Sequence, residues 1–349
     1  MRRAGVPGDD RLRAYVEELT RIFKAAPSKH QAHERSRRVL EDISTDRSFI
    51  TAILWRYLSI PESLNAKNYP VVGIDIELNP SYHLVANCWI PLPNSETNIS
   101  TKAIHHHGNM LLTTVNLLGP GYEHWLFTQP KVVDPERELY EMEVVERERH
   151  AVHHVAFVDA WIPHLPVYPK RLSITLCLWS SQHPTSWVDY VKRIPWLSKH
   201  AAILRQRMVC AGLAKPLDLK VINYFDFYPT DDGFQAMKDR IEYTRGPNED
   251  HLYNVFHVLQ ETGNDHLAPL VERELESGNV PFTNPQLIQR LLEDLRSGHR
   301  IQGRLSTCHF GIPHANFTTQ EIEHVINLQR SRKGERPKVP LAVGALHAG

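Results

Sequence analysis

The chain has no excess of charge of either sign. Its 40 Lys and Arg residues balance its 40 Asp and Glu residues, so the formal net charge is zero. Nucleic acid and anionic membrane surfaces usually attract proteins through a basic excess. The short basic clusters at 35–38 and 330–336 are typical of solvated helix faces and tails. The sequence therefore predicts no nucleic-acid partner and no membrane partner.

Cysteines and long apolar runs are also scarce. None of the four cysteines forms a CxxC pair with another, which is typical of a reduced intracellular protein and not of a disulfide framework. No apolar stretch approaches the ~20 residues of a membrane-spanning helix, and the N-terminus lacks the apolar segment of a signal peptide. We therefore expect a cytoplasmic protein.

The motifs of the commonest nucleotide-dependent and hydrolytic enzymes are missing as well. The sequence contains no phosphate-binding P-loop, no dinucleotide-binding glycine pattern, no GxSxG and no HExxH. Any chemistry must therefore come from another constellation of residues.

The apolar pattern divides the chain into four segments. Helical spacing extends from about residue 10 to residue 60, short alternating runs follow from Tyr69 to Trp179, and helical spacing returns from about residue 185. Short strands separated by Gly- and Pro-containing turns are typical of an antiparallel barrel or jelly roll. The sequence predicts an α+β fold with N-terminal helices at 1–65, a β-barrel at 66–184, a mainly helical region at 185–330 and a disordered tail at 331–349.

Three finer expectations follow from the same patterns. Residues 110–127 are predicted to form one β-hairpin around Gly119-Pro120-Gly121. His153 and His154 are predicted to lie inside a strand, on opposite faces. In the C-terminal region, helices are expected over 250–260, 267–276 and 286–296.

A run of three histidines immediately precedes the expected hairpin. His105 and His107 are two positions apart, and on a strand such residues point to the same face, with His106 pointing away. Two imidazoles on one face form half of a metal site for zinc, copper, iron or nickel. His164, at the edge of the strand that ends at Trp179, is the preferred third ligand, and His154 is the alternative.

This pattern resembles the cupin superfamily, and within it the cysteine-dioxygenase-like branch. That branch has His-x-His-x-Asn, a glycine twelve residues after the second histidine and then a Glu. The chain has His107, Asn109, Gly119 and Glu123 in the same register, and His164 stands ahead of a β-strand. The resemblance covers roughly residues 70–182.

The resemblance implies a function as well as a cupin-type barrel. It implies a mononuclear non-haem Fe(II) oxygenase of the dioxygenase type, which binds a small-molecule substrate and O2 at one metal. The implied metal ligands and catalytic residues are His105, His107 and His164. Cupin barrels often dimerise, so a homodimer is also implied.

The departures from that branch concern the substrate. Its Ser, His and Tyr on the strand after the third ligand are replaced by Thr175, Cys177 and Trp179, and Leu112 stands where a crosslinking cysteine would be. An arginine that would hold an amino-acid carboxylate is missing too, so we do not expect free cysteine to be the substrate. The candidate pocket and supporting residues are Leu112, Glu123, Trp125, Trp161, Tyr168, Thr175, Cys177 and Trp179.

Several alternatives stay open. Glu123 either accepts a hydrogen bond from a ligating imidazole or is a plain exposed carboxylate, and Tyr168 either donates to the site or packs its turn. The metal is Fe(II) or, alternatively, Zn, Ni or Mn. The opposing function is a non-oxidative metal-dependent cupin, such as an isomerase, a lyase or a small-molecule binder. A third interpretation is a silent barrel whose helical parts bind a partner protein.

Overall fold

The computed structural model describes residues 9–67, 71–91, 107, 109–129, 131–134, 139–141, 144–167, 169–181, 220–221 and 247–304. The predictions for His105, His106, Tyr168 and the tail at 331–349 lie outside these ranges. Of the helices within them, none combines the length and the apolar character that crossing a bilayer requires.

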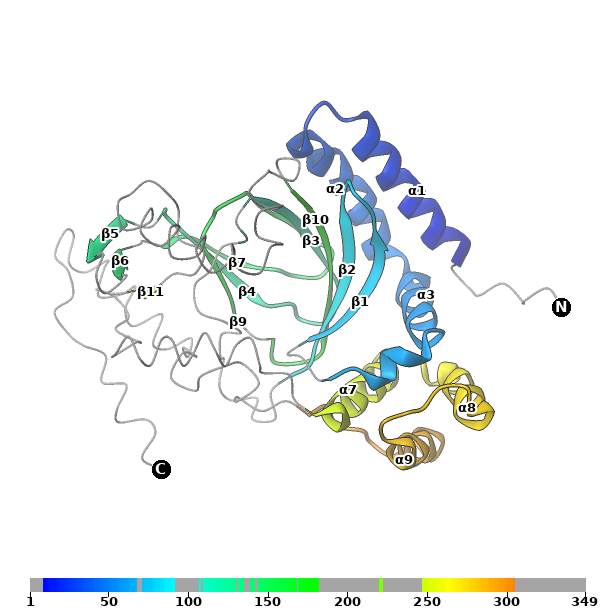
Figure 1. The fold of residues 1–349 in the computed structure, drawn as a ribbon. Helices are drawn as coiled ribbons and strands as arrows, with labels where there is room; N and C mark the ends of the chain where they lie inside the picture. Colours follow the sequence, from blue (N-terminus) through cyan, green and yellow to red (C-terminus); the bar gives the residue numbers. More distant parts are fainter. Residues whose placement is uncertain are drawn as a thin grey trace, which may run out of the picture.

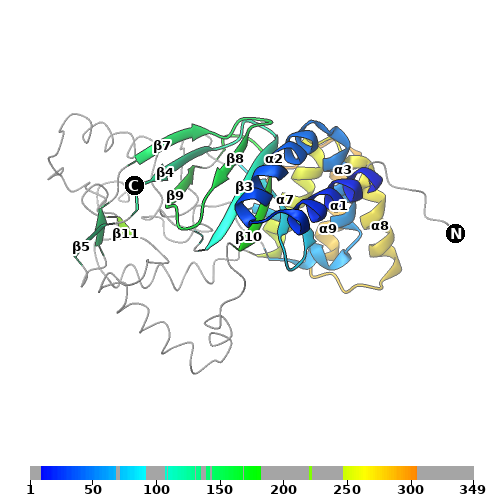
Figure 2. The same ribbon diagram turned by 90° about the horizontal axis from the view of Figure 1, so that it is seen from above.

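The centre of the molecule is built from two antiparallel sheets that face each other (Figures 1 and 2). The larger sheet has the order β1 (Val71–Leu78), β2 (His83–Trp89), β10 (Ser173–Ser181), β3 (Met110–Leu118) and β8 (Val155–Val158). The smaller sheet has the order β7 (Val144–Arg149), β4 (Glu123–Phe127) and β9 (His164–Val167). This arrangement, in which the chain passes repeatedly from one sheet to the other, is that of the jelly roll, the fold of the cupins.

Closure of the barrel is the part of the prediction that the structure does not bear out. Within the described ranges no strand of the larger sheet pairs with a strand of the smaller one. The α+β class and the antiparallel pairing are present, but the strands form two facing sheets instead of one closed ladder.

The prediction of one hairpin over 110–127 is also wrong, because its two strands belong to different sheets. β3 pairs with β10 and β8, whereas β4 pairs with β7 and β9. The turn at Gly119-Pro120-Gly121 carries the chain from one sheet to the other, and it does not fold two strands onto each other. Sequence spacing fits both outcomes, since a short Gly-rich turn can join strands of one sheet or of two.

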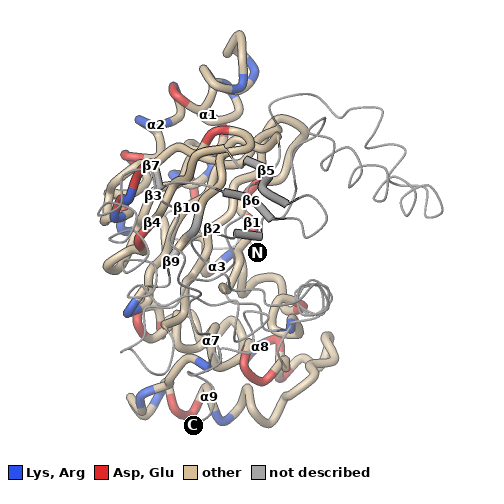
Figure 3. The backbone as a smooth tube through the Cα atoms, turned by 90° about the vertical axis from the view of Figure 1, so that its left-hand side faces the viewer, with Lys and Arg blue, Asp and Glu red and all other residues tan. Residues whose placement is uncertain are grey.

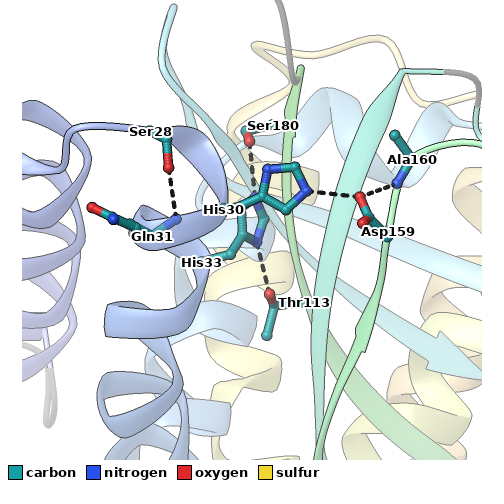
Figure 4. Close-up of polar contacts among 8 residues, drawn as sticks. All are labelled: Ser28, His30, Gln31, His33, Thr113, Asp159, Ala160 and Ser180. Carbon is teal, nitrogen blue, oxygen red and sulfur yellow. Dashed lines mark hydrogen bonds and ion pairs between the residues drawn. The ribbon is translucent and has the colours of Figure 1, made fainter.

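The N-terminal helices cover the outer face of the larger sheet. They are α1 (Asp9–Ala25), α2 (Lys29–Thr45) and α3 (Arg47–Leu58). Ser28 caps the N-terminus of α2, and its side chain accepts a hydrogen bond from the backbone N–H of Gln31. The helix is fixed to the sheet by His33, whose ring nitrogens lie 2.7 Å from Thr113 Oγ1 on β3 and 2.8 Å from Ser180 Oγ on β10 (Figure 4).

The C-terminal helices pack beside α3 and the edge strand β1. The helices expected over 250–260, 267–276 and 286–296 are present as α7 (Asn248–Glu261), α8 (Ala268–Ser277) and α9 (Pro285–Arg296). Buried side chains of these helices, of the N-terminal helices and of the larger sheet form one continuous hydrophobic core. Acidic and basic positions are interspersed along these helices and on β7 (Figure 3).

Two local predictions differ from the structure. His153 and His154 lie ahead of β8 and not inside a strand, and His153 has a left-handed backbone with φ of 66°. The region expected to be mainly helical also contributes a short strand, β11 (Lys220–Val221), which forms a small sheet with β6 (Leu139–Glu141) and β5 (Lys131–Asp134).

Candidate metal centre

The space between the two sheets is lined by alternate residues of each strand. On β3 and β10, Thr113 and Ser180 face α2, so their neighbours face the smaller sheet. Leu112, Cys177 and Trp179 accordingly pack together with Leu126 of β4. The predicted pocket residues Leu112, Thr175, Cys177 and Trp179 all lie on this inner face.

Three histidines from different segments meet in this interior. The ring centroids of His107 and His164 are 4.4 Å apart, and those of His124 and His164 are 5.3 Å apart. Trp179 stands edge-on to His107 with a centroid distance of 4.5 Å. The structure therefore brings two of the three predicted ligands together, and His105, the third, lies outside the described residues.

His164 is oriented by a backbone carbonyl. Its Nδ1 lies 2.9 Å from the carbonyl oxygen of Ile162, and the ring is only 3% exposed. Because a carbonyl can only accept, the proton sits on Nδ1 and the lone pair on Nε2. Metal-ligating histidines characteristically donate their second ring nitrogen in this way. The tautomer inferred from this contact therefore fits a metal ligand.

His124 is the member of this cluster that sequence reasoning missed. It is 6% exposed, and burial, followed by the proximity of His164 and His150, lowers its pKa from 6.5 to about 3. The ring is thus neutral near pH 7. The available signal was strand alternation, because His124 must face the side opposite to Glu123.

Glu123 and Trp125 lie on the outer face of β4. The Glu123 carboxylate accepts hydrogen bonds from the guanidinium of Arg147, at 3.1 and 3.2 Å, and from Trp125 Nε1 at 3.3 Å. The Arg147 guanidinium also stacks over the Trp125 ring at 4.8 Å. Of the two roles open for Glu123, these contacts fit the outward-facing carboxylate, and Trp125 does not line the interior.

His154, the alternative third ligand, has a different partner. Its Nε2 lies 2.9 Å from Glu148 Oε1, and its ring contacts His150. Two candidate pocket residues remain. Trp161 is half-buried ahead of β9, and Tyr168 lies outside the described ranges. Within the described part of the chain, no three His, Cys, Asp or Glu side chains are grouped so as to hold an ion by themselves. A metal centre at His107 and His164 would therefore need a further ligand from outside these residues, and His105 is the one that the sequence predicts.

A row of hydrogen-bonded polar side chains continues from the histidines across the inner face. Asn87 donates to Cys177 Sγ at 3.4 Å, and the Cys177 thiol donates to Thr114 Oγ1 at 3.7 Å. Thr114 Oγ1 also lies 3.2 Å from His150 Nε2. The ring of Tyr122 stands edge-on to the ring of His150, with centroids 5.2 Å apart. Burial raises the pKa of both the Cys177 thiol and the Tyr122 phenol, so each keeps its proton near pH 7.

Comparison with known proteins gives only distant structural matches, several of which are described as cupins. No protein-family model and no curated protein matches the sequence. A DMSP lyase from Ruegeria pomeroyi is 12% identical over 34% of this chain, with a TM-score of 0.23. The Cnp3 cupin domain of Schizosaccharomyces pombe is 8% identical, covering 37% of this chain and 74% of its own, with a TM-score of 0.23. A cupin-2 domain from Rhodospirillum rubrum is 15% identical, covering 43% of this chain and 83% of its own, with a TM-score of 0.20.

These similarities are partial. The chain spans 46% and 50% of the two DMSP lyase chains that it matches. At such TM-scores the matches support no conclusion about activity. The assignment of the jelly-roll fold therefore depends on the strand order itself.

Proposed function

We propose that this protein is a metal-dependent cupin that acts on a small organic molecule, with the metal held by His105, His107 and His164. The observation that carries the proposal is the meeting of His107 and His164 between the two sheets, with Nδ1 of His164 held by the carbonyl of Ile162. His124 lies beside His164 as a further neutral imidazole.

The donor set fits a first-row divalent metal. All its members are imidazoles, and the positions where many cupins place a carboxylate ligand hold Leu111 and Leu112. Imidazole nitrogens suit iron, zinc and nickel. When bound, such a metal would supply Lewis-acid chemistry or a binding place for O2.

The side chains around the histidines would orient the substrate and exclude water. Leu112, Leu126 and Trp179 form an apolar wall beside His107, whereas Thr175 and Cys177 form a polar one. The described part of the chain buries no Arg or Lys side chain, so nothing described there would clamp an amino-acid carboxylate. This supports a substrate other than free cysteine.

Within this class we favour a non-haem Fe(II) oxygenase of the dioxygenase type. The support is the all-imidazole donor set next to an apolar wall, which suits a site that takes up a small organic molecule and O2. Substrate and O2 are then the partners, with Zn, Ni or Mn as the alternative metals.

A non-oxidative metal-dependent lyase or isomerase is the second candidate. It is favoured by the protonated groups that lie close to the histidines, namely the phenol of Tyr122 and the thiol of Cys177, since proton transfer is central to such reactions.

Metal analysis of untagged protein tests the proposal. We expect one equivalent of metal per chain, its loss in His107→Ala and in His164→Ala, and its retention in His154→Ala, the matched control. Circular dichroism should show that all three variants stay folded. Full metal content in His164→Ala would contradict the ligand assignment, and absence of any metal from the wild-type protein would contradict the function.

O2 consumption separates the two candidate chemistries. Iron with substrate-dependent O2 uptake is expected for the oxygenase. Zinc, nickel or manganese with no O2 uptake would replace the oxygenase by the non-oxidative enzyme.

A further inference from the structure

We propose that the groove between α2 and the edge strand β8 binds a small aromatic carboxylate, with the carboxylate held by Arg37 and the ring lying against Phe157. The groove has a volume of about 280 Å³. It lies on the outer face of the larger sheet, whereas the candidate metal centre lies on the inner face. The proposed binding site is therefore separate from the proposed metal site and does not depend on it.

The groove exists because α2 lies over the middle of the larger sheet and not over its edge. His33 fixes the helix above β3 and β10 through Thr113 and Ser180. β8 follows β3 as the last strand in the order of this sheet. A hollow is left between the helix and Phe157 of β8, with His33 and Thr113 among the residues that line it.

Two contacts across the groove hold the helix and the strand together. His30 Nε2 lies 2.9 Å from Asp159 Oδ1, just beyond the end of β8 (Figure 4). Two helical turns further along α2, the Arg37 guanidinium donates to the backbone carbonyl of Val155 at 3.1 Å. The walls of the groove are thus fixed before a ligand arrives, and a preformed site loses less free energy to ordering on binding.

Arg37 has hydrogen-bond donors that its own chain does not use. Within the described ranges it makes one hydrogen bond, to Val155, and it forms no ion pair with a carboxylate. Its side chain is half-buried and lines the groove. A guanidinium carries several N–H donors in a fixed fork, which matches a carboxylate through two parallel hydrogen bonds. The charge of the ligand that fits this group is therefore negative.

Phe157 supplies the surface for a ring. It is half-buried and stands opposite Thr113 on β3, so it faces the same side of the sheet as α2. Its ring centroid lies 6.1 Å from that of His30 and 5.7 Å from that of His33. Aromatic rings pack well in such edge-to-face and tilted arrangements. A cavity of about 150 Å³ is enough to bind benzene, so this groove has room for one ring with its carboxylate.

The charges around the groove favour a carboxylate over an amine. Glu34 also lines the groove, but it is exposed, and solvent screens its charge. The half-buried charge of Arg37 is screened less, and His30 already has the Asp159 carboxylate as its partner. Removal of the Glu34 charge should consequently strengthen the binding of an anion, and removal of the Arg37 charge should weaken it.

Benzoate is the probe that tests the site, and its affinity is measured by ligand-observed NMR titration. We expect saturable binding to the wild-type protein, with benzamide, the neutral analogue, and benzylamine, the cationic one, both weaker. Arg37→Met, which keeps the apolar stem of the side chain, should weaken benzoate on the order of tenfold. Glu34→Gln should tighten it about threefold, as expected for an exposed charge.

Arg38→Met is the matched control, because Arg38 is an exposed neighbour on α2 that does not line the groove. It should leave the affinity for benzoate unchanged, and circular dichroism should show that the variants stay folded. Equal affinity in Arg37→Met and the wild type would overturn the proposal, as would tighter binding of benzylamine than of benzoate. If Arg37→Met does not fold, weaker or unchanged binding in Glu34→Gln would overturn it instead.

A second variant distinguishes the groove from the metal centre as the place where benzoate binds. His107→Ala, which alters the inner face of the sheet, should bind benzoate as the wild type does. Loss of binding in His107→Ala, with binding retained in Arg37→Met, would place benzoate at the metal centre and would overturn the groove site. Absence of saturable binding to the wild-type protein would overturn it as well, without bearing on the metal content.

Discussion

At the scale of single residues, His33 is the side chain that fixes the helical layer to the sheet. It is almost fully buried between α2 and the larger sheet, with Thr113 and Ser180 at its two ring nitrogens (Figure 4). On the other face of the same strands lie Leu112 and Trp179, which line the candidate metal centre. Burial, followed by the proximity of His30 and Lys29, lowers the pKa of His33 from 6.5 to about 3.

This shift predicts a loss of stability in mild acid. Between pH 6.5 and about 3 the unfolded chain binds a proton at His33 that the folded chain does not, so stability is present above this window and is lost as the pH falls through it. Each pH unit within this window lowers the free energy of unfolding by up to about 1.4 kcal/mol. Between pH 7 and pH 5, His33 therefore lowers the free energy of unfolding by about 2 kcal/mol.

Urea unfolding at several pH values measures this effect. His33→Asn should be less stable than the wild type at pH 7 and should lose less stability on going to pH 5. His83→Asn, which alters a surface histidine paired with Asp75, is the control and should keep the wild-type pH dependence. Equal slopes for His33→Asn and the wild type would contradict the prediction.

At the scale of elements, the turn Gly119-Pro120-Gly121 joins the two sheets and places the interior groups. Gly121 has φ of 69°, and a Cβ there would lie 1.7 Å from the carbonyl oxygen of His150. The backbone N–H of His150 in turn donates to the Tyr122 carbonyl at 2.9 Å. The absence of a side chain at position 121 therefore allows His150 and Tyr122 to lie side by side.

Gly121→Ala should consequently destabilise the protein by about 2–5 kcal/mol, since left-handed strain and overpacking add. Gly263→Ala is a matched control, because Gly263 has φ of 66° with nothing within 4 Å of its Cβ position, and it should cost only about 1 kcal/mol. Urea unfolding compares the two. Similar losses would mean that the close approach to His150 does not matter.

At the scale of the whole molecule, the N-terminal helices, the larger sheet and the C-terminal helices share one core. Leu19 on α1 and Leu291 on α9 are both fully buried in it. Leu19→Ala and Leu291→Ala should each cost about 2–5 kcal/mol and should shift a single unfolding transition seen by circular dichroism and by tryptophan fluorescence. Two separate transitions, each moved by one variant, would instead indicate independent units.

Local patterns were sufficient for most elements of this fold. Helical spacing located α7, α8 and α9 to within about two residues, and short alternating runs located the strand-forming region between Tyr69 and Trp179. Local patterns could not predict which strands pair with each other, because strand pairing is decided by contacts between residues that are distant in the sequence. The Gly-Pro-Gly turn illustrates this, since its local chemistry is the same whether the next strand joins the same sheet or the opposite one.

At the candidate metal centre, too, some residues could be predicted from local patterns and others could not. The His-x-His spacing singled out His107, and the position of His164 ahead of a strand singled out its partner; their ring centroids are 4.4 Å apart in the structure. Strand alternation places His124 on the face opposite to Glu123, but nothing local showed which of the two faces is buried. Nothing local distinguished His150 from the other histidines of a chain that has 21. Their burial depends on which face of the smaller sheet turns inward, and that face is set by the strands on the opposite side.

The sequence by itself determined the α+β class, most of the described helices and strands, and the donor type that the proposed metal site would have, because periodicity and residue chemistry are local properties. Only the tertiary structure decided that the strands form two facing sheets, that Glu123 turns outward to Arg147, and that His124, Tyr122 and His150 line the interior. These outcomes depend on how separate strands pair and on which faces they bury against each other.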